Sequence, residues 1–309
     1  MSNSDTKPFP AEKTFSSYNQ EQGKAYAEIR RDYHPKVYQT VLDQHLSTDG
    51  KLHTLLDVGC GPGNVARSLG VNFAHVIGLD PSDGMIKTAR SLGGSSATSE
   101  PIRYEVSTAE DLGQLQDSSI DLITIANAAH WFDMPRFWLR AAKVLKPGGS
   151  VAIWCSGDIR TDPSLPNSEA IQAAMDDYLL RYLQPYYERG NWMTRTRYTD
   201  LPMPWNITEP VSEFDEHTFF RKDWVPEEEP FFVGLPEADM DTFEKMMATH
   251  SAYTRWAQAN PDIAGTDKDG IRILRKEIER LLQEAGVEKG REKTKGVVYG
   301  AVLVVKKKV

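Results

Sequence analysis

The sequence predicts an α/β fold in which a doubly wound, mostly parallel sheet has helices on both faces. Between residues 54 and 155, short apolar runs alternate with segments of helical periodicity. Such alternation is typical of strand–helix–strand units with right-handed crossovers. In addition, the run from Ile120 to Ala126 is mostly apolar, as expected for a strand buried on both faces of a parallel sheet.

Cap and turn residues mark the first two units. Thr54–Val58 is a short apolar run, and a glycine-rich turn separates it from a helix expected over Asn64–Leu69. The next apolar run, His75–Leu79, is followed by Ser82, whose hydroxyl suits the N-cap of a second helix. The order is therefore strand, helix, strand, helix.

The same alternation continues to residue 155. Ile102–Val106 is a third candidate strand, and the helix expected over Pro135–Leu145 has proline in its first turn, where a missing N–H is tolerated. Lys146–Gly149 ends this helix and leads into a strand over Val151–Cys155. In sheets of this kind, ligands bind at the carboxyl ends of the strands.

The second half of the chain differs in character. From residue 157 to about 294, prolines and aromatic residues are frequent, and we interpret this range as an insertion or cap. Near its end, apolar residues at helical spacing from Ile271 to Ala285 form one face of a helix that Gly286 closes. Gly296–Val305 is a final strand that we expect to rejoin the sheet.

Charge and hydropathy exclude several classes of function. The 309 residues have a formal net charge of -8, which disfavours nucleic acid and anionic membrane surfaces as partners. The segment from Met1 to Thr14 has no apolar centre of a secretion signal, and no apolar run is long enough to span a membrane. We expect a cytoplasmic protein, as a monomer or homodimer. The runs Glu227–Glu229 and Lys306–Lys308 are expected to be solvated surface.

Metal and disulfide sites are also not expected. Cys60 and Cys155 lack the paired spacing of a zinc site or a disulfide framework, which fits a reducing compartment. No group of His, Cys or carboxylate residues has ligand spacing.

A glycine-rich loop stands between the first strand and the first helix. Asp57 precedes Gly59, Gly61 and Gly63, which let the backbone turn sharply and leave room for a ligand. Asp80 ends the second strand, where a carboxylate can accept hydrogen bonds from both hydroxyls of a ribose. A nicotinamide-dependent oxidoreductase would use the same features, but with the spacing G-x-G-x-x-G. The spacing G-x-G-x-G argues against it.

With its motif D-V-G-C-G-P-G from Asp57 to Gly63, the sequence resembles the class I S-adenosylmethionine-dependent methyltransferases. Leu145–Gly149 before a strand, and Ser107–Asp111, resemble two further motifs of that family. The resemblance covers residues 54–155 and implies a seven-stranded Rossmann-like methyltransferase fold. It divides the chain into an N-terminal helical arm (1–45), the S-adenosylmethionine-binding core (46–156), a substrate cap (157–294) and the final strand (295–309).

The resemblance also implies contacts to the cofactor. By this resemblance, the methionine part of the cofactor contacts Asp57, Gly59, Gly61 and Gly63, and the ribose contacts Asp80. The adenine contacts Met85, Ala109 and Glu110, and the methionine end contacts Asn127.

A closer likeness, spread over most of the chain, is to the fungal trans-aconitate methyltransferase group. It lies in Ala129–Asp133, Pro185–Glu188, Arg195–Arg197 and Ser251–Trp256. It implies as acceptor a small di- or tricarboxylic acid, which is ionised at neutral pH and needs no general base. The implied catalytic residues are His130 and Trp131, and the implied substrate-binding residues are Tyr18, Arg30, Trp154, Tyr186, Arg195, Arg197, Tyr253 and Trp256.

Other functions stay open at this point. An O-methyltransferase of phenols or hydroxyls, or an N-methyltransferase of secondary metabolism, would use His130 as a general base. A binder that has lost its chemistry is disfavoured by the intact glycine loop and Asp80. Methylation of nucleic-acid bases is disfavoured because Asn127–His130 lacks the proline–aromatic signature of such enzymes.

Overall fold

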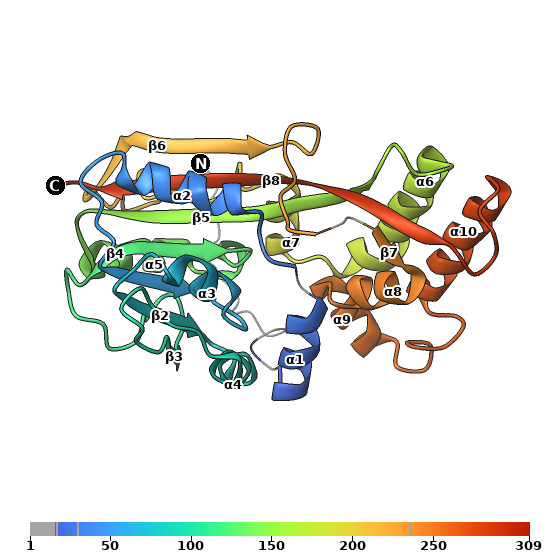
Figure 1. Cartoon of the computed structure of the whole chain (residues 1–309), viewed down its shortest axis with the longest axis horizontal. Helices are drawn as coiled ribbons and strands as arrows, with labels where there is room; N and C mark the ends of the chain where they lie inside the picture. The colour runs from blue at the N-terminus through green and yellow to red at the C-terminus, as the bar shows by residue number, and fades with distance from the viewer. Residues whose placement is uncertain (1–15, 17, 30, 235–236) are drawn as a thin grey trace, which may run out of the picture.

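The computed structural model describes residues 16, 18–29, 31–234 and 237–309. The described residues form one mixed sheet of eight strands (Figure 1). The strands are β1 (Thr54–Val58), β2 (His75–Asp80), β3 (Arg103–Val106), β4 (Ile120–Ala126), β5 (Leu145–Thr161), β6 (Phe214–Trp224), β7 (Glu237–Asp239) and β8 (Lys293–Lys307).

Seven of these strands lie in one row, in the order β3-β2-β1-β4-β5-β8-β6. The first five are parallel, while β8 runs antiparallel between β5 and β6. The eighth, β7, pairs with the first residues of β8. The doubly wound, mostly parallel sheet expected from the sequence is thus confirmed, and the last strand does rejoin it.

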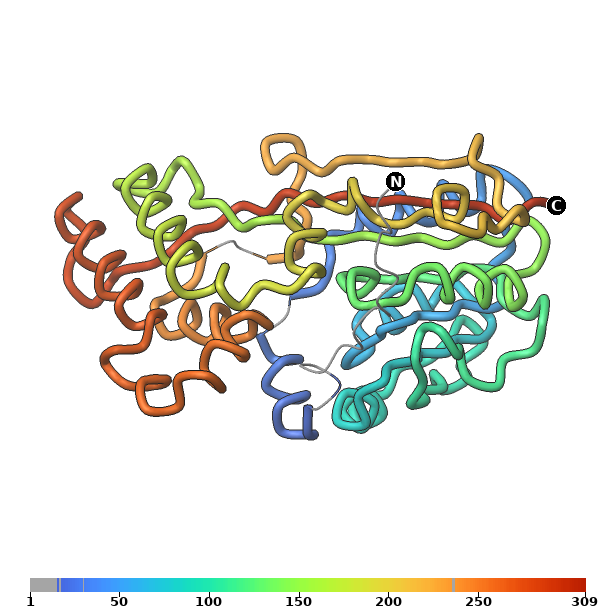
Figure 2. The backbone as a smooth tube through the Cα atoms, turned by 180° about the vertical axis from the view of Figure 1, so that it is seen from behind, coloured from blue at the N-terminus to red at the C-terminus, as the bar shows by residue number. Residues whose placement is uncertain are grey.

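Helices cover both faces of this sheet. The helices of the described residues are α1 (Gln20–Ile29), α2 (Pro35–Leu46), α3 (Asn64–Gly70), α4 (Asp83–Leu92), α5 (Met134–Val144), α6 (Ser168–Tyr178), α7 (Arg189–Arg195), α8 (Met240–Ala248), α9 (Ser251–Ala259) and α10 (Gly270–Glu284), with short turns η1 (Ala129–Trp131), η2 (Leu179–Leu183) and η3 (Gln184–Tyr186). Residues of α2, α3 and α4 share one apolar core. Residues of α5 and of the segment from 193 to 214 share the core of the other face, and Figure 2 shows both on the same side of the sheet.

The central strands are buried on both faces. Leu55 and Leu122 belong to the core beneath α2 and α3, whereas their chain neighbours Leu56 and Ile123 belong to the core beneath α5. All four side chains are fully buried. This two-sided burial explains why these runs are apolar without alternation.

Local signals set several element boundaries as expected. The Ser82 hydroxyl accepts a hydrogen bond from the Met85 N–H and caps α4, and Asp133 caps α5. The segment Lys146–Gly149, however, is part of a longer strand. Leu145 pairs with Ile120 and Ser150 pairs with Leu122, so the four residues between them form an irregularity within β5.

A second group of helices forms its own lobe. Buried residues of α6, α8, α9 and α10 make a separate core, and β5 and β8 extend from the sheet toward this lobe as a paired ribbon (Figure 1). Within the range expected to be an insertion, β6 belongs to the sheet and pairs with β8. The helical lobe therefore stands beside the carboxyl ends of the parallel strands.

The expectation that the terminal lysine run is solvated is wrong for two of its members. Lys306 is 5% exposed, and its Nζ donates to the hydroxyls of Ser47 (3.0 Å) and Thr48 (2.6 Å), just after α2. Lys307 Nζ donates to the carbonyl of Ala142 (2.6 Å) in the last turn of α5. Adjacent strand residues point to opposite faces, so each ammonium reaches the negative end of a different helix.

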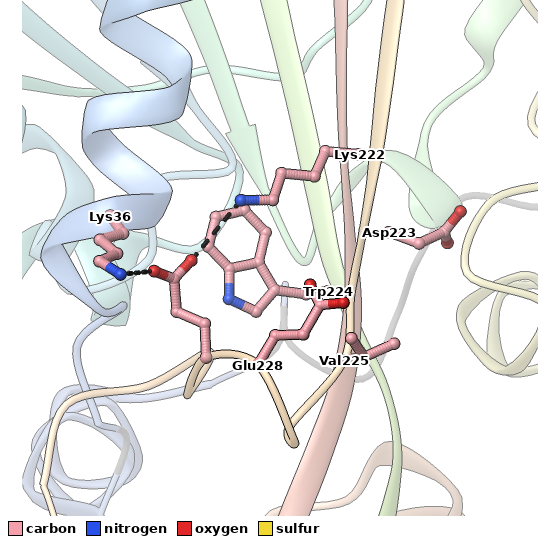
Figure 3. A pocket seen from close by; sticks show the side chains of 7 residues that line it. Lys36, Lys222, Asp223, Trp224, Val225 and Glu228 are labelled. Carbon is pink, nitrogen blue, oxygen red and sulfur yellow. Dashed lines mark ion pairs between the residues drawn. The ribbon is translucent and has the colours of Figure 1, made fainter.

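The acidic run is also not wholly solvated. Glu229, whose side chain is 11% exposed, forms ion pairs with Lys36 and with Lys222 (3.6 Å). Lys222 Nζ lies 4.0 Å from the centre of the Trp224 ring. These side chains line a hollow of about 240 Å³, and Figure 3 shows Lys36, Lys222 and Trp224 around it. Among the described residues, no helix is long and apolar enough to cross a membrane.

Candidate active site

The glycine loop between β1 and α3 is shaped for a ligand. Gly59, Gly61 and Gly63 all have positive φ angles, from +53° to +84°. At Gly63 an added Cβ would lie 2.5 Å from the Tyr104 hydroxyl. At Gly61 an added Cβ would meet nothing within 4 Å. The middle of the loop therefore borders open space, whereas its end is packed against the sheet.

Asp80 ties this loop to the end of β2. Its Oδ2 accepts a hydrogen bond from the Gly61 N–H (2.9 Å) and its Oδ1 accepts one from the Ser82 N–H (2.9 Å). The residue is 8% exposed. Because a carboxylate has about four acceptor positions, Asp80 can hold the loop and still accept hydrogen bonds from a ligand's hydroxyl groups.

Asp57 is a buried carboxylate with one satisfied oxygen. Its Oδ1 accepts a hydrogen bond from the Thr124 hydroxyl (2.9 Å), whereas Oδ2 has no hydrogen-bond partner in the described part of the chain. Burial raises the pKa of Asp57 to about 7, although the Thr124 hydroxyl opposes this shift. A buried oxygen of this kind suits a cationic group of a ligand.

Asn127 stands at the carboxyl end of β4 with a φ of +51°. Its Nδ2 donates to the Tyr33 hydroxyl (2.8 Å), and its Oδ1 accepts from the N–H of Ser156 (2.8 Å) in β5. The side chain thus joins two neighbouring strand ends to the segment that follows α1. Asn127 and Asp80 lie at the ends of strands on either side of β1, which leads into the glycine loop.

The residues expected to contact an adenine lie on elements that follow β2 and β3. Met85 is 3% exposed near the start of α4, and Ala109 is 4% exposed in the core beneath α5. Glu110 Oε1 accepts a hydrogen bond from the Asp133 N–H (2.8 Å) at the start of α5. Their role toward a ligand stays a prediction.

His130 lies in η1, three residues after Asn127. Its Nδ1 is 2.6 Å from the Tyr198 hydroxyl, and both side chains are buried. The ring of Trp131 packs against the imidazole, with the two ring centres 4.7 Å apart. Sequence reasoning missed Tyr198, and its one sequence signal is its place directly after the Arg195–Arg197 motif.

Arg195 and Arg197 both hold carboxylates already. Arg195 Nη2 is 2.9 Å from Asp158 Oδ2, and Arg197 Nη1 is 3.7 Å from Asp223 Oδ1. An added Cβ on Gly157 would lie 3.0 Å from Arg197 Cγ, and Gly157 directly follows the strand residue that binds Asn127. The aliphatic part of Arg197 therefore passes close to Gly157, while the two guanidinium groups pair with carboxylates on β5 and β6.

Comparison with known proteins agrees with this geometry. A family model described as a methyltransferase domain matches residues 56–153. A Dictyostelium discoideum protein described as a methyltransferase is 29% identical over 195 residues, which cover 63% of this chain and 67% of that protein. A Saccharomyces cerevisiae protein described as an S-adenosylmethionine-dependent methyltransferase is 24% identical over 247 residues, which cover 76% of this chain and 81% of that protein. This chain is an S-adenosylmethionine-dependent methyltransferase.

A solved structure shares the fold of this methyltransferase. It is a chain from Anaeromyxobacter dehalogenans described as a type II methyltransferase, with a TM-score of 0.58 and 22% identity, and the match covers 89% of this chain and 97% of that chain. The cofactor is S-adenosylmethionine. The buried Asp57 Oδ2 and the open space at Gly61 fit its ammonium group and its bulk.

The N-terminal arm of the methyltransferase lies directly on α4. The carbonyl of Tyr18 accepts a hydrogen bond from the Ser82 hydroxyl (3.3 Å), and an added Cβ on Gly84 would lie 2.2 Å from that carbonyl oxygen. Figure 1 shows α1 between the sheet and the helical lobe. Arg30 lies outside the described residues. Tyr18 is therefore placed beside the Asp80–Ser82 turn, although its contact with substrate stays a prediction.

Three other predicted substrate contacts have partners within the helical lobe. The Tyr253 hydroxyl donates to Asp269 Oδ2 (2.7 Å), and its ring stacks on Trp256 at 5.5 Å. The Tyr186 hydroxyl accepts from Asn260 Nδ2 (3.0 Å). These contacts fix α9 and η3 within the lobe, and none of them shows a contact with the cofactor loop.

Trp154 is placed differently from the prediction. Its side chain is fully buried and packs edge-on against Tyr33, with ring centres 5.5 Å apart. It therefore lies in the core behind Tyr33 and is not a wall of the substrate site in this structure. Trp154 contacts the site through Tyr33, whose hydroxyl accepts a hydrogen bond from Asn127 Nδ2, and through its own carbonyl, which accepts one from the Asn127 N–H (2.8 Å).

Proposed function

We propose that this methyltransferase esterifies a carboxylate of a small di- or tricarboxylic acid. The observation that carries the proposal is the pair of guanidinium groups at and just after the end of α7, the helix whose Gly190 packs against His130. Arg195 and Arg197 already hold the carboxylates of Asp158 and Asp223. Arginine binds carboxylates through a planar fork of donors, so this region has the chemistry to hold an acid with more than one carboxylate.

A carboxylate acceptor needs no proton transfer. Its reference pKa is near 4, so it is ionised at neutral pH. When bound, S-adenosylmethionine supplies a methyl group on a cationic sulfur. The new bond forms between a carboxylate oxygen and the methyl carbon, the sulfur–methyl bond breaks, and its electron pair stays on sulfur. Protein side chains then have to align and desolvate the acceptor, which is worth up to roughly 7–11 kcal/mol.

We assign the cofactor contacts to the residues predicted from the sequence. Asp57 and the glycine loop would hold the methionine part, Asp80 the ribose, and Asn127 the methionine end. Met85, Ala109 and Glu110 would border the adenine. The support is geometric: the loop and the strand ends that carry Asp80 and Asn127 meet at one edge of the sheet.

Binding an acid requires the arginines to change or share partners. Asp158 lies 2.9 Å from Arg195, and burial raises the pKa of the Asp158 carboxyl while Arg195 opposes the shift. The internal carboxylate thus competes with a substrate for the same donors. Replacing Asp158 by Asn removes the competing charge and is expected to lower KM for a polycarboxylate.

The test compares acids with one, two and three carboxylates. We expect methyl esters from the polycarboxylates, and a KM for them that rises about 10-fold or more in Arg195→Lys and Arg197→Lys, because lysine loses the two-pronged geometry. The matched control is Arg181→Lys, since Arg181 pairs with Asp177 on the exposed surface of the lobe and should leave KM unchanged. Equal KM values in all three variants, or equal rates with monocarboxylates, would contradict the proposal.

The second candidate is methylation of a phenol, hydroxyl or amine with His130 as general base. The position of His130 beyond Asn127 favours it. The two candidates require different protonation of the imidazole, because a base needs an unprotonated nitrogen toward the acceptor, whereas a carboxylate is held by an N–H donor.

A further inference from the structure

The contact between His130 and Tyr198 is short and enclosed. Nδ1 and the hydroxyl oxygen are 2.6 Å apart, and the exposed fractions are 6% for His130 and 2% for Tyr198. Nδ1 of His130 is the side-chain partner of the Tyr198 hydroxyl. The contact therefore has to provide a hydrogen bond for the phenol hydroxyl and for Nδ1 of the imidazole.

The phenol proton decides which atom donates. Burial raises the pKa of Tyr198 well above its usual value, so the hydroxyl keeps its proton. A buried O–H donor without an acceptor is unfavourable, and Nδ1 is the acceptor within reach. If Nδ1 accepts this bond, the neutral imidazole carries its own proton on Nε2.

The backbone around Tyr198 is strained in a way that aims its side chain. Arg197 and Tyr198 have φ angles of +52° and +62°, a region that bulky residues rarely adopt. The strain is held by the bond from the Tyr198 N–H to the Met193 carbonyl (2.9 Å) and by the bond from Arg221 Nη2 to the Arg197 carbonyl (2.9 Å). Such fixed strain is typical of functional sites.

The imidazole is also confined from the side of α7. An added Cβ on Gly190 would lie 3.0 Å from His130 Cδ2, the ring carbon next to Nε2, and 2.9 Å from the His130 carbonyl oxygen. The glycine lets α7 approach the ring closely. Tyr198 and α7 therefore fix the orientation of a side chain that stands three residues beyond Asn127.

We infer that Tyr198 is a positioning residue that holds His130 with its proton on Nε2, so that His130 donates a hydrogen bond to the acceptor oxygen and does not act as a general base. The role toward the acceptor rests on the proposed carboxylate methylation. The tautomer itself does not, because it follows from the buried pair.

The tautomer can be measured directly in the full-length protein. Histidine labelled with ¹⁵N gives long-range ¹H–¹⁵N NMR patterns that distinguish protonated Nδ1 from protonated Nε2, and the His130 signals are assigned by their loss in His130→Gln. We expect protonated Nε2 in the unmodified protein and a mixture of tautomers in Tyr198→Phe. Protonated Nδ1 in the unmodified protein would overturn the inference.

Kinetics test the role of the donor. Glutamine can place an N–H near the position of Nε2, so His130→Gln is expected to keep most of the turnover with a carboxylate acceptor, whereas His130→Ala should lose about 10- to 100-fold. If His130 is a base, both variants lose about 100- to 10,000-fold, which would overturn the inference. Tyr198→Phe should lower kcat several-fold with little change in KM for the cofactor.

These outcomes separate the inference from the proposed function. Methyl transfer only to phenols or amines, together with protonated Nε2, would refute the carboxylate acceptor and leave the Tyr198–His130 assignment standing. Methyl esters together with protonated Nδ1 would refute the assignment of Tyr198 and leave the acceptor standing.

Discussion

Replacing Asp57 by Asn should separate what this carboxylate costs the fold from what it contributes to cofactor binding. Asp57 is 1% exposed, and its Oδ2 is buried with no hydrogen-bond partner in the described residues. Its pKa is raised from the usual 3.8 to about 7. Asparagine has nearly the same shape and no charge, so it removes the desolvation of the ionised form.

The direction of the pH effect follows from the raised pKa. The protonated form favours the folded chain, so its contribution to stability is fully present below pH 3.8 and is lost as the pH rises through about 7. The whole shift corresponds to roughly 4 kcal/mol. Between pH 5 and pH 8, the free energy of unfolding of the unmodified protein should fall by roughly 2–3 kcal/mol relative to Asp57→Asn.

The cofactor should reverse this penalty. The ammonium group of S-adenosylmethionine beside Oδ2 favours the ionised carboxylate, so saturating cofactor should stabilise the unmodified protein more at pH 8 than at pH 5. In Asp57→Asn the association constant for the cofactor should fall about 10- to 100-fold, the loss expected for one buried charged contact, and the pH dependence of cofactor binding should disappear.

Urea unfolding at pH 5 and pH 8, with and without cofactor, measures both effects. Thr124→Val is the directional control, because it removes the hydroxyl bond that lowers the Asp57 pKa and should move the transition to higher pH. This account of Asp57 would be refuted if the free energies of unfolding of Asp57→Asn and of the unmodified protein differed by the same amount at both pH values, or if Asp57→Asn bound the cofactor with unchanged affinity.

Three further outcomes follow from local geometry. Gly61→Ala should change the free energy of unfolding by no more than about 1 kcal/mol but abolish cofactor binding measured by calorimetry. Gly63→Ala should strongly lower the midpoint of thermal unfolding, because an added Cβ has no room there. The reverse pattern would contradict the loop geometry. Lys307→Met should cost about 1–2 kcal/mol in urea unfolding through loss of the bonds at the end of α5, and unchanged stability would show that these bonds contribute nothing. Burial raises the pKa of Cys60 well above the usual value and that of Cys155 to about 12, so neither should react with a thiol reagent at pH 8 until the protein unfolds, and rapid reaction of the folded protein would contradict their burial.

The succession of the first five strands along the chain could be predicted because its signals are local. The glycine loop, the Ser82 cap and the two-sided apolar strand at Ile120–Ala126 each depend on a few neighbouring residues. Asp57 and Asp80 could be placed at one edge because parallel strands end together. These parts of the fold and of the cofactor site required no knowledge of distant contacts.

The sheet beyond β5 could not be predicted in the same way. β6 has runs of charged residues between its aromatic ones and is half-exposed, so its composition resembles that of a surface segment. Its assignment depends on pairing with β8, which follows about seventy residues later in the chain. The burial of Lys306 likewise depends on the end of α2, at the other end of the sequence.

Side-chain direction was a separate limit. In a strand buried on both faces, apolar character does not show which way Trp154 points, and it points into the core. Tyr198 reaches His130 only because of two successive positive φ angles, which nothing in Thr196–Tyr198 signals. The carboxylate partners of Arg195 and Arg197 also come from other elements.

Identification of the methylated product tests the proposed reaction most directly. The purified methyltransferase would be incubated with S-adenosylmethionine labelled in its methyl group, together with trans-aconitate and other small polycarboxylates, phenols and amines, and the products would be resolved by mass before and after mild alkaline hydrolysis. Label in methyl esters of the acids, released by alkali, is the predicted result. Label found only in alkali-stable methyl ethers or methylamines would contradict the account.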